Sequence, residues 1–146
     1  MKGLALGLAL AFAIVACGGQ QLPADWEVRQ HKMDELTALW SQIRQWRHES
    51  HMALDPAPRD VFQWGPRSPQ EVERVCPAYH EVPTKCGDVC SLGDDICDNA
   101  ERICTLADEL GKDDVDAQDK CHSAKASCRE AKQRCCDCAA TEGATP

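Results

Sequence analysis

The sequence predicts an all-α protein in which a disulfide-laddered antiparallel helical hairpin carries an additional N-terminal amphipathic helix packed on it. Three observations predict this fold: cysteines that recur every seven residues in two sets, small residues that accompany both sets, and charges of opposite sign beside them. The first set is Cys90, Cys97 and Cys104, and the second is Cys121, Cys128 and Cys135.

The spacing of the cysteines is the strongest of these observations. Seven residues make nearly two helical turns, so the cysteines of one set share a helix face at intervals of about 10.5 Å. The two sets mirror each other about a point near Lys112 and Asp113. Two antiparallel helices joined there, with axes about 9–10 Å apart, leave the roughly 4.4–6.8 Å between Cα atoms that a disulfide needs. The expected rungs are Cys104–Cys121, Cys97–Cys128 and Cys90–Cys135.

The neighbours of these cysteines support the same register. Helices that approach so closely need small residues between them, and these stand three positions after the cysteines: Gly93, Ala100, Ala107, Ala124, Ala131 and Cys138. The next positions are acidic on the first helix and lysine on the second. The mirror places Glu101 beside Lys125 and Asp94 beside Lys132, each a pair of opposite charges.

Four further cysteines lie at the open end of the hairpin: Cys76, Cys86, Cys136 and Cys138. Because Cys86 and Cys138 lie about one turn beyond the last rung, we expect them to form a fourth rung. Cys76 and Cys136 would then tie the preceding linker to the hairpin. The swapped pairing, Cys76–Cys138 with Cys86–Cys136, is an open alternative. Each bridge contributes about 2–4 kcal/mol, and less where its loop is already closed by a neighbouring bridge.

The N-terminus has the pattern of a targeting segment. Lys2 is followed by an apolar run over residues 4–15, which is too short to span a bilayer and has the form of a signal peptide. The run ends in Ile14, Val15 and Ala16 before Cys17, which resembles the bacterial lipobox. We therefore expect residues 1–16 to be a signal peptide and Cys17 to carry lipid. An ordinary secretory signal is the alternative, but it would leave Cys17 as an odd eleventh thiol, whereas lipidation leaves ten cysteines.

A lipidated Cys17 also predicts where the protein is located. Residues 17–24 form a tether that keeps the domain within roughly 25–30 Å of the bilayer. Gly18 is not the aspartate associated with inner-membrane retention. The resemblance therefore implies an outer-membrane lipoprotein of the bacterial cell envelope, facing the periplasm or the surface. Cysteines exported to such a compartment are oxidised by default, which agrees with the ladder.

Residues 25–75 are expected to hold the N-terminal helix and a Pro-rich linker with a short helix. Apolar residues at spacings of three and four predict a helix over residues 24–54: Trp26, Met33, Leu36, Trp40 and Ile43. We expect this helix to pack on a heptad stripe of the hairpin: Val89, Ile96, Ile103 and Leu110. A Trp-rich docking or membrane-surface helix is the alternative, and the lack of a basic face weakens it.

The linker after this helix is expected to be irregular over residues 60–67. Pro56 and Pro58 end the helix before it. Ser68 to Glu71 form a capping box that should start a short helix to about Val75.

The cysteine-rich hairpin is expected over residues 76–139. Its first helix should begin with Ser91 as the N-cap and end at Leu110, with Gly111 as the C-cap. The second helix should follow a cap at Asp113 or Asp114 and end near Ala139. Residues 140–146 are expected to be a disordered tail.

The sequence predicts neither a catalytic site nor a resident metal. His48 and His51 would share a helix face but lack a third ligand. Residues 114–119 resemble the start of a calcium loop, yet the glycine at its sixth position is missing and Lys125 occupies the twelfth. No nucleophile and base stand together, so we expect neither an enzyme activity nor a cofactor. The net charge of −8 argues against nucleic acid as a partner.

The cysteine pattern also resembles a known group of proteins. Cys-x6-Cys, then Ile-Cys-x-Leu-Ala-Asp, then Cys-x6-Cys-x6-Cys-Cys-x-Cys lie within residues 86–138. With the lipobox, they resemble small cysteine-rich lipoproteins of unknown function in environmental bacteria. The resemblance implies a location and a helical hairpin, and it implies no activity.

Three classes of function remain. The one we favour is a membrane-anchored, disulfide-stabilised envelope lipoprotein that acts as a structural or protein-interaction module, with the bilayer and an envelope protein as its partners. The alternative is a soft-metal (copper) binding or storage protein using cysteine thiolates, superficially similar to bacterial copper-storage helical bundles. A thiol–disulfide oxidoreductase using Cys136 and Cys138 is the third, and it lacks a thioredoxin-like βαβ pattern.

Overall fold

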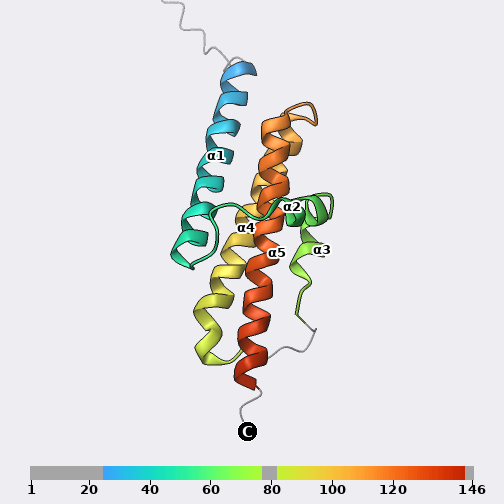
Figure 1. Cartoon of the computed structure of the whole chain (residues 1–146). Helices are drawn as coiled ribbons and strands as arrows, with labels where there is room; N and C mark the ends of the chain where they lie inside the picture. The colour runs from blue at the N-terminus through green and yellow to red at the C-terminus, as the bar shows by residue number, and fades with distance from the viewer. Residues whose placement is uncertain (1–24, 77–81, 144–146) are drawn as a thin grey trace, which may run out of the picture.

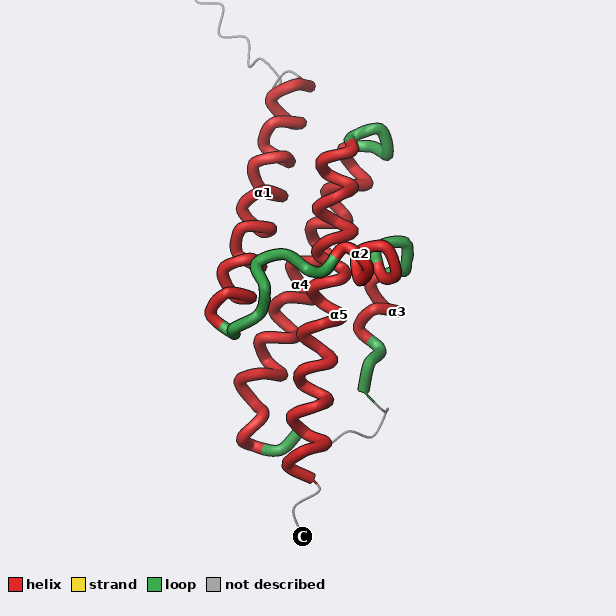
Figure 2. The backbone as a smooth tube through the Cα atoms, in the orientation of Figure 1, coloured by secondary structure: helices red, strands yellow, loops and turns green. Residues whose placement is uncertain are grey.

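The computed structural model describes residues 25–76 and 82–143, and all of its secondary structure in these ranges is helical (Figures 1 and 2). The signal peptide, the lipidated Cys17 and the tether that we expect before residue 25 lie outside the described residues. The helices follow in the order α1 (Asp25–Glu49), α2 (Pro58–Trp64), α3 (Pro69–Glu73), the short 3-10 helix η1 (Thr84–Cys86), α4 (Gly87–Leu110) and α5 (Val115–Gly143).

The helices α4 and α5 form the antiparallel hairpin, and they lie side by side along their length (Figure 1). The turn between them begins at Gly111, whose φ of 103° is a conformation that favours glycine. It ends at Asp114, whose Oδ1 accepts a hydrogen bond from the Ala117 backbone N–H at 3.2 Å and so caps α5. The turn is the point about which the two sets of cysteines are mirrored.

Five disulfides join the cysteines of the described chain, and three of them are the rungs that the mirror register predicts. The three rungs have Cα–Cα distances of 4.6 to 4.7 Å: Cys90–Cys135, Cys97–Cys128 and Cys104–Cys121. The pairing that the sequence left open is resolved as Cys86–Cys138 and Cys76–Cys136, with Cα–Cα distances of 5.9 and 5.4 Å. Small residues allow this approach, because even a Cβ added at Gly93 would lie 3.4 Å from the carbonyl oxygen of Ala131.

The N-terminal helix packs on the hairpin as predicted. Leu36 and Ile43 of α1 are fully buried in one core with Ile96 and Ile103 of α4. Ion pairs follow the seam, among them Arg102–Glu35 at 2.7 Å and Lys32–Glu109 at 3.2 Å. α1 is about as long as α4, but it is shifted along the bundle and extends past the α4–α5 turn, so it covers only the half of α4 nearest that turn (Figure 1).

The end of α1 lies earlier than the sequence predicts. The helix stops at Glu49 rather than near Leu54, because His51 adopts a φ of 58° and reverses the chain. Arg47 fixes this turn from inside the fold: its side chain is fully buried, and its Nε donates to the Ala53 carbonyl oxygen at 2.8 Å. Its Nη2 also pairs with Glu130 of α5 at 2.8 Å.

The linker prediction is wrong over residues 60–67, since most of this segment forms α2. Pro58 occupies the first turn of the helix after an extended Ala57, which is a favourable position for proline. The prediction for α3 is confirmed: Ser68 and Glu71 form the reciprocal capping box, with the Ser68 backbone N–H donating to Glu71 at 2.9 Å. Val72 of α3 is buried in the core.

Both helices of the hairpin extend further than predicted at its open end. The first begins at Gly87, directly after η1, rather than with Ser91 as its cap. The second continues past Ala139 to Gly143, so the first residues of the expected tail are helical. The disulfide from Cys86 to Cys138 and the ion pair between Lys85 and Glu142 hold these last turns together.

Candidate functional site

The disulfide ladder offers no free thiol within the described residues. All ten of the cysteines there are bridged, and Cys97 and Cys128 are only 3% and 1% exposed. Glu73 lies with these two sulfurs in a group whose atoms are within 4.8 Å of one another. The thiolate is the form of cysteine that binds metals, and the sulfurs of this group are bonded to each other.

The bridges also bear on the alternative of a thiol–disulfide oxidoreductase. Cys136 and Cys138 belong to two different bridges, to Cys76 and to Cys86, and so do not form a reactive pair. Five disulfides in one small domain indicate an oxidising, extracytoplasmic location. The ladder therefore acts as the framework that holds other groups in place.

The strongest candidate for a functional site is an apolar surface centred on α2. Its centre is Phe62, whose 86% exposure is the highest among the exposed large hydrophobic residues of the described chain. One open depression of about 550 Å³ lies beside it, and we call its lining the α2 surface: Pro56, Pro58, Val61, Phe62, Pro66 and His122.

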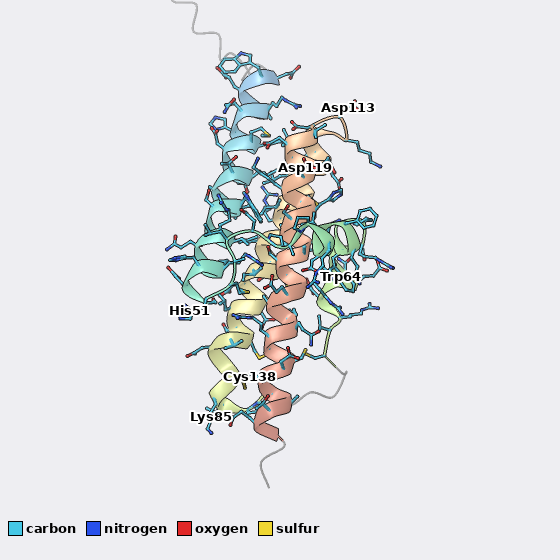
Figure 3. The ribbon with its side chains drawn as sticks, in the orientation of Figure 1. His51, Trp64, Lys85, Asp113, Asp119 and Cys138 are labelled. Carbon is cyan, nitrogen blue, oxygen red and sulfur yellow. A yellow bond between two sulfur atoms is a disulfide. The ribbon has the colours of Figure 1, made fainter. Side chains whose placement is uncertain are left out.

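The local sequence explains why Phe62 faces outward. Successive residues of a helix are about 100° apart, so Phe62 and Trp64 point to nearly opposite sides of α2. Trp64 faces α5, where the guanidinium of Arg129 lies 4.1 Å from the centre of its ring (Figure 3). Phe62 is consequently directed away from the hairpin.

Side chains of α5 hold this short helix and the chain that follows it in place. Lys125 donates from Nζ to the Arg67 carbonyl oxygen at 2.8 Å, and Arg129 donates to the Arg74 carbonyl oxygen at 3.1 Å. The cation–π contact of Arg129 with Trp64 adds about 0.5–1 kcal/mol or more. These contacts, with the Cys76–Cys136 bridge further along, fix α2 on α5 although it has only seven residues.

Lys125 has a different role from the one that the sequence predicts. It is 8% exposed and donates to the backbone beyond α2, whereas the mirror paired it with Glu101. The other predicted pair, Asp94 with Lys132, is present. Burial lowers the pKa of the Lys125 ammonium, and the nearby carboxylate of Asp108 partly opposes this shift.

Close packing at Gly65 brings α2 against α5. Gly65 is buried, and a Cβ added there would lie 2.6 Å from the Val61 carbonyl oxygen and 2.8 Å from Cβ of His122. The side chain of His122 on α5 therefore packs against the end of α2 at Gly65. Burial, and then the charge of Lys125, lower the pKa of its imidazole.

Paired charges surround the apolar centre of the α2 surface. Arg59 pairs with Asp60, and Arg67 pairs with Glu71, each at 3.6 Å. An apolar centre inside a polar rim is the arrangement of protein–protein interfaces. The α2 surface can therefore bury an apolar side chain of a partner without leaving an unpaired charge at its edge.

A second, smaller hollow lies where α1 ends and the hairpin continues. It has a volume of about 250 Å³, and its lining is mainly apolar: Ser50, Met52, Asp88, Val89, Leu92, Ala131 and Arg134. Ligand pockets usually have about 300–1,000 Å³, so this hollow is small for a ligand site. Val89, the first member of the predicted stripe, is 38% exposed here because α1 does not reach it.

The histidine pair and the calcium-like segment do not form a site in the part of the chain that the structure describes. His48 and His51 are both exposed, and His51 lies in the turn beyond α1 rather than on its face (Figure 3). Asp114 of the calcium-like segment acts as the cap of α5. The α2 surface was missed because Val61, Phe62 and Pro66 lie in the segment predicted to be irregular. Pro58, at the start of α2, was the helix signal that the sequence offered there.

Comparison with protein-family models, with curated proteins and with solved structures finds no match to this chain. Among the described helices, none combines the length and the apolar character needed to cross a membrane.

Proposed function

We propose that this protein is a bilayer-anchored envelope lipoprotein that acts as a protein-interaction module and presents the α2 surface to a protein partner. The lipobox at Cys17 supports the anchor, and the outer membrane is its proposed location. The five disulfides support a module that keeps its shape outside the cytoplasm.

The observation that carries this proposal is the exposure of Phe62 on a helix that is itself fixed. Single exposed hydrophobic residues are common on protein surfaces. Phe62 differs because its helix is held by Lys125, Arg129 and the packing at Gly65, so the ring is presented on an ordered support. Burying such a side chain contributes about 1.5–3 kcal/mol. A fixed surface also loses little conformational entropy when it binds.

Site-specific photo-crosslinking in intact cell envelopes tests the proposal. The lipidated full chain carries a photoreactive phenylalanine analogue at position 62, and a matched variant carries it at the exposed Gln45 of α1. We expect a discrete protein adduct from position 62 and not from position 45. The same adduct should be lost when Arg59 and Gln63, which flank Phe62 on α2, are replaced by glutamate.

Two results would count against the proposal. Equal adducts from positions 62 and 45 would show non-specific contact, and no adduct from position 62 would leave the α2 surface without a protein partner. Because Phe62 is exposed, its replacement should leave the helical circular dichroism unchanged, which controls for folding.

A further inference from the structure

We infer that one end of the bundle rests on the bilayer surface and inserts Trp26 and Val115 among the lipid headgroups. This end, which we call the tether end, consists of the first turn of α1 and the α4–α5 turn. The inference rests on the proposed lipid anchor at Cys17, and it adds the orientation of the domain on the membrane.

Exposed apolar side chains gather at the tether end. Trp26 is 66% exposed, Val28 is 41% exposed and Val115 is 67% exposed, so this end has three of the seven exposed large hydrophobic residues of the described chain. Trp26 and Val28 belong to the start of α1, and Val115 is the first residue of α5. Figure 1 shows both starts at the same end of the bundle, opposite the C-terminal end of α5.

Polar contacts join the two parts of the tether end into one body. Arg29 forms an ion pair with Asp114 and also donates from Nη1 to the Leu110 carbonyl oxygen at 3.1 Å. One turn further along α1, Lys32 pairs with Glu109 at 3.2 Å. Trp26 and Val115 are therefore held on a common support while their side chains stay outside the core.

The length of the preceding chain brings this end to the membrane. Residues 17–24 are eight residues long and span at most about 28 Å when fully extended. A lipid on Cys17 therefore holds the start of α1 close to the headgroups. Tryptophan prefers this interface, because its ring combines an apolar body with a polar N–H group.

The charge of the tether end indicates which lipids it contacts. Asp116 is exposed but pairs with Lys120. Asp25 and Asp113 are also exposed in this region, against the exposed Lys112 of the turn. Anionic headgroups repel such a surface, whereas zwitterionic headgroups do not. The tether end therefore rests on a bilayer surface of zwitterionic lipids.

This orientation leaves the α2 surface free. An α-helix rises about 1.5 Å per residue, so the 29 residues of α5 extend roughly 43 Å from the bilayer. α2 lies on the flank of the bundle, about halfway along α5 (Figure 1). A partner can reach it beside the domain without entering the lipid.

Fluorescence quenching by brominated lipids tests this orientation. The lipidated full chain is reconstituted into phosphatidylcholine vesicles whose acyl chains carry bromine, and co-flotation with the vesicles is measured on the same sample. The chain has four tryptophans, at positions 26, 40, 46 and 64. We expect quenching in the parent protein, its loss in Trp26→Phe, and its retention in the matched control Trp64→Phe.

The possible outcomes separate this inference from the anchor proposal. A protein that does not float with the vesicles overturns the anchor and the orientation together. A protein that floats without Trp26-dependent quenching overturns the orientation alone. Quenching lost only in Trp64→Phe would place the flank of the bundle that carries α2 on the bilayer instead. A Trp26 emission that shifts with the protein-to-lipid ratio, without quenching, would show that a second copy covers the tether end.

Discussion

Single residues decide how α2 is presented, and Gly65 is the clearest case. Replacing Gly65 by alanine forces a Cβ against the Val61 carbonyl oxygen and His122, so α2 must move away from α5. We expect the free energy of unfolding to fall by about 1–3 kcal/mol. Denaturant unfolding followed by tryptophan fluorescence measures this change.

The matched control for this substitution is Gly87→Ala at the start of α4. No atom lies within 4 Å of a Cβ added at Gly87. Alanine favours the helical conformation over glycine, so this variant should be neutral or more stable by about 0.5–1 kcal/mol. Equal destabilisation by both substitutions would contradict the close packing of α2 on α5.

The lowered pKa of His122 predicts that acid loosens the α2 surface. Burial, followed by the charge of Lys125, disfavours the imidazolium in the folded state. The unfolded chain then binds more protons between the folded pKa and the ordinary value of about 6.5. The stability that His122 contributes is therefore present above about pH 6.5 and is lost as the pH falls through this window.

Unfolding measurements at a series of pH values between 7.5 and 5 check this expectation. His122→Gln cannot titrate in this range, so the parent protein should lose more stability than the variant as the pH falls. A parallel decline of the two proteins would show that His122 does not contribute to the pH dependence.

At the scale of elements, the seven-residue ladder could be predicted and α2 could not. Disulfide geometry and helix periodicity restrict the chain so strongly that the positions of Cys97 and Cys128 define the register of two helices. A helix as short as α2 has little stability of its own and depends on tertiary contacts. Those contacts, from Arg129 to Trp64 and from Lys125 to Arg67, join segments that no local pattern connects.

The difference between local patterns and tertiary contacts also explains why Lys125 has another partner than predicted. The mirror rule considers only the two helices of the hairpin, and it correctly pairs Asp94 with Lys132. At Lys125 the chain beyond α2 covers the seam and supplies the Arg67 carbonyl oxygen instead. The site around Phe62 could not be predicted because it exists only after α2 has docked.

The packing of α1 gives a prediction at this scale. Ile103 is fully buried between α1 and the hairpin, so Ile103→Asp places a charge in the apolar core. Burial of such a side chain is worth about 1.5–3 kcal/mol, and its loss should detach α1 while the bridged hairpin stays folded. Limited proteolysis should then cut within α1 and leave a disulfide-linked hairpin fragment.

Val89→Asp is the matched control, because Val89 belongs to the same heptad stripe but is 38% exposed beyond the end of α1. Protease resistance should stay unchanged in this variant. If Ile103→Asp were as resistant as Val89→Asp, the packing of α1 would not depend on this stripe.

The whole molecule is anchored through Cys17 in our account, and substitution of that residue tests the anchor. A Cys17→Ser variant cannot receive the lipid, so we expect it to leave the membrane fraction or to keep its signal peptide. Fractionation and intact mass measure both outcomes. A variant that is processed and membrane-bound like the parent protein would refute the anchor assignment.

At the scale of the whole molecule, the oxidation state of the ladder separates an interaction module from a copper binder. Copper binding needs reduced thiolates, whereas the structure has Cys104–Cys121, Cys97–Cys128 and Cys90–Cys135 as bridges. The two remaining bridges, Cys86–Cys138 and Cys76–Cys136, occupy the end with the densest cysteines.

Peptide mapping of the exported, non-reduced protein, with free thiols alkylated first, tests this central claim most directly. Our account predicts no alkylated residue among the ten cysteines from Cys76 to Cys138, and peptides linked in the five pairs of the structure. Six or more alkylated cysteines together with stoichiometric copper would contradict it and favour the metal-binding alternative.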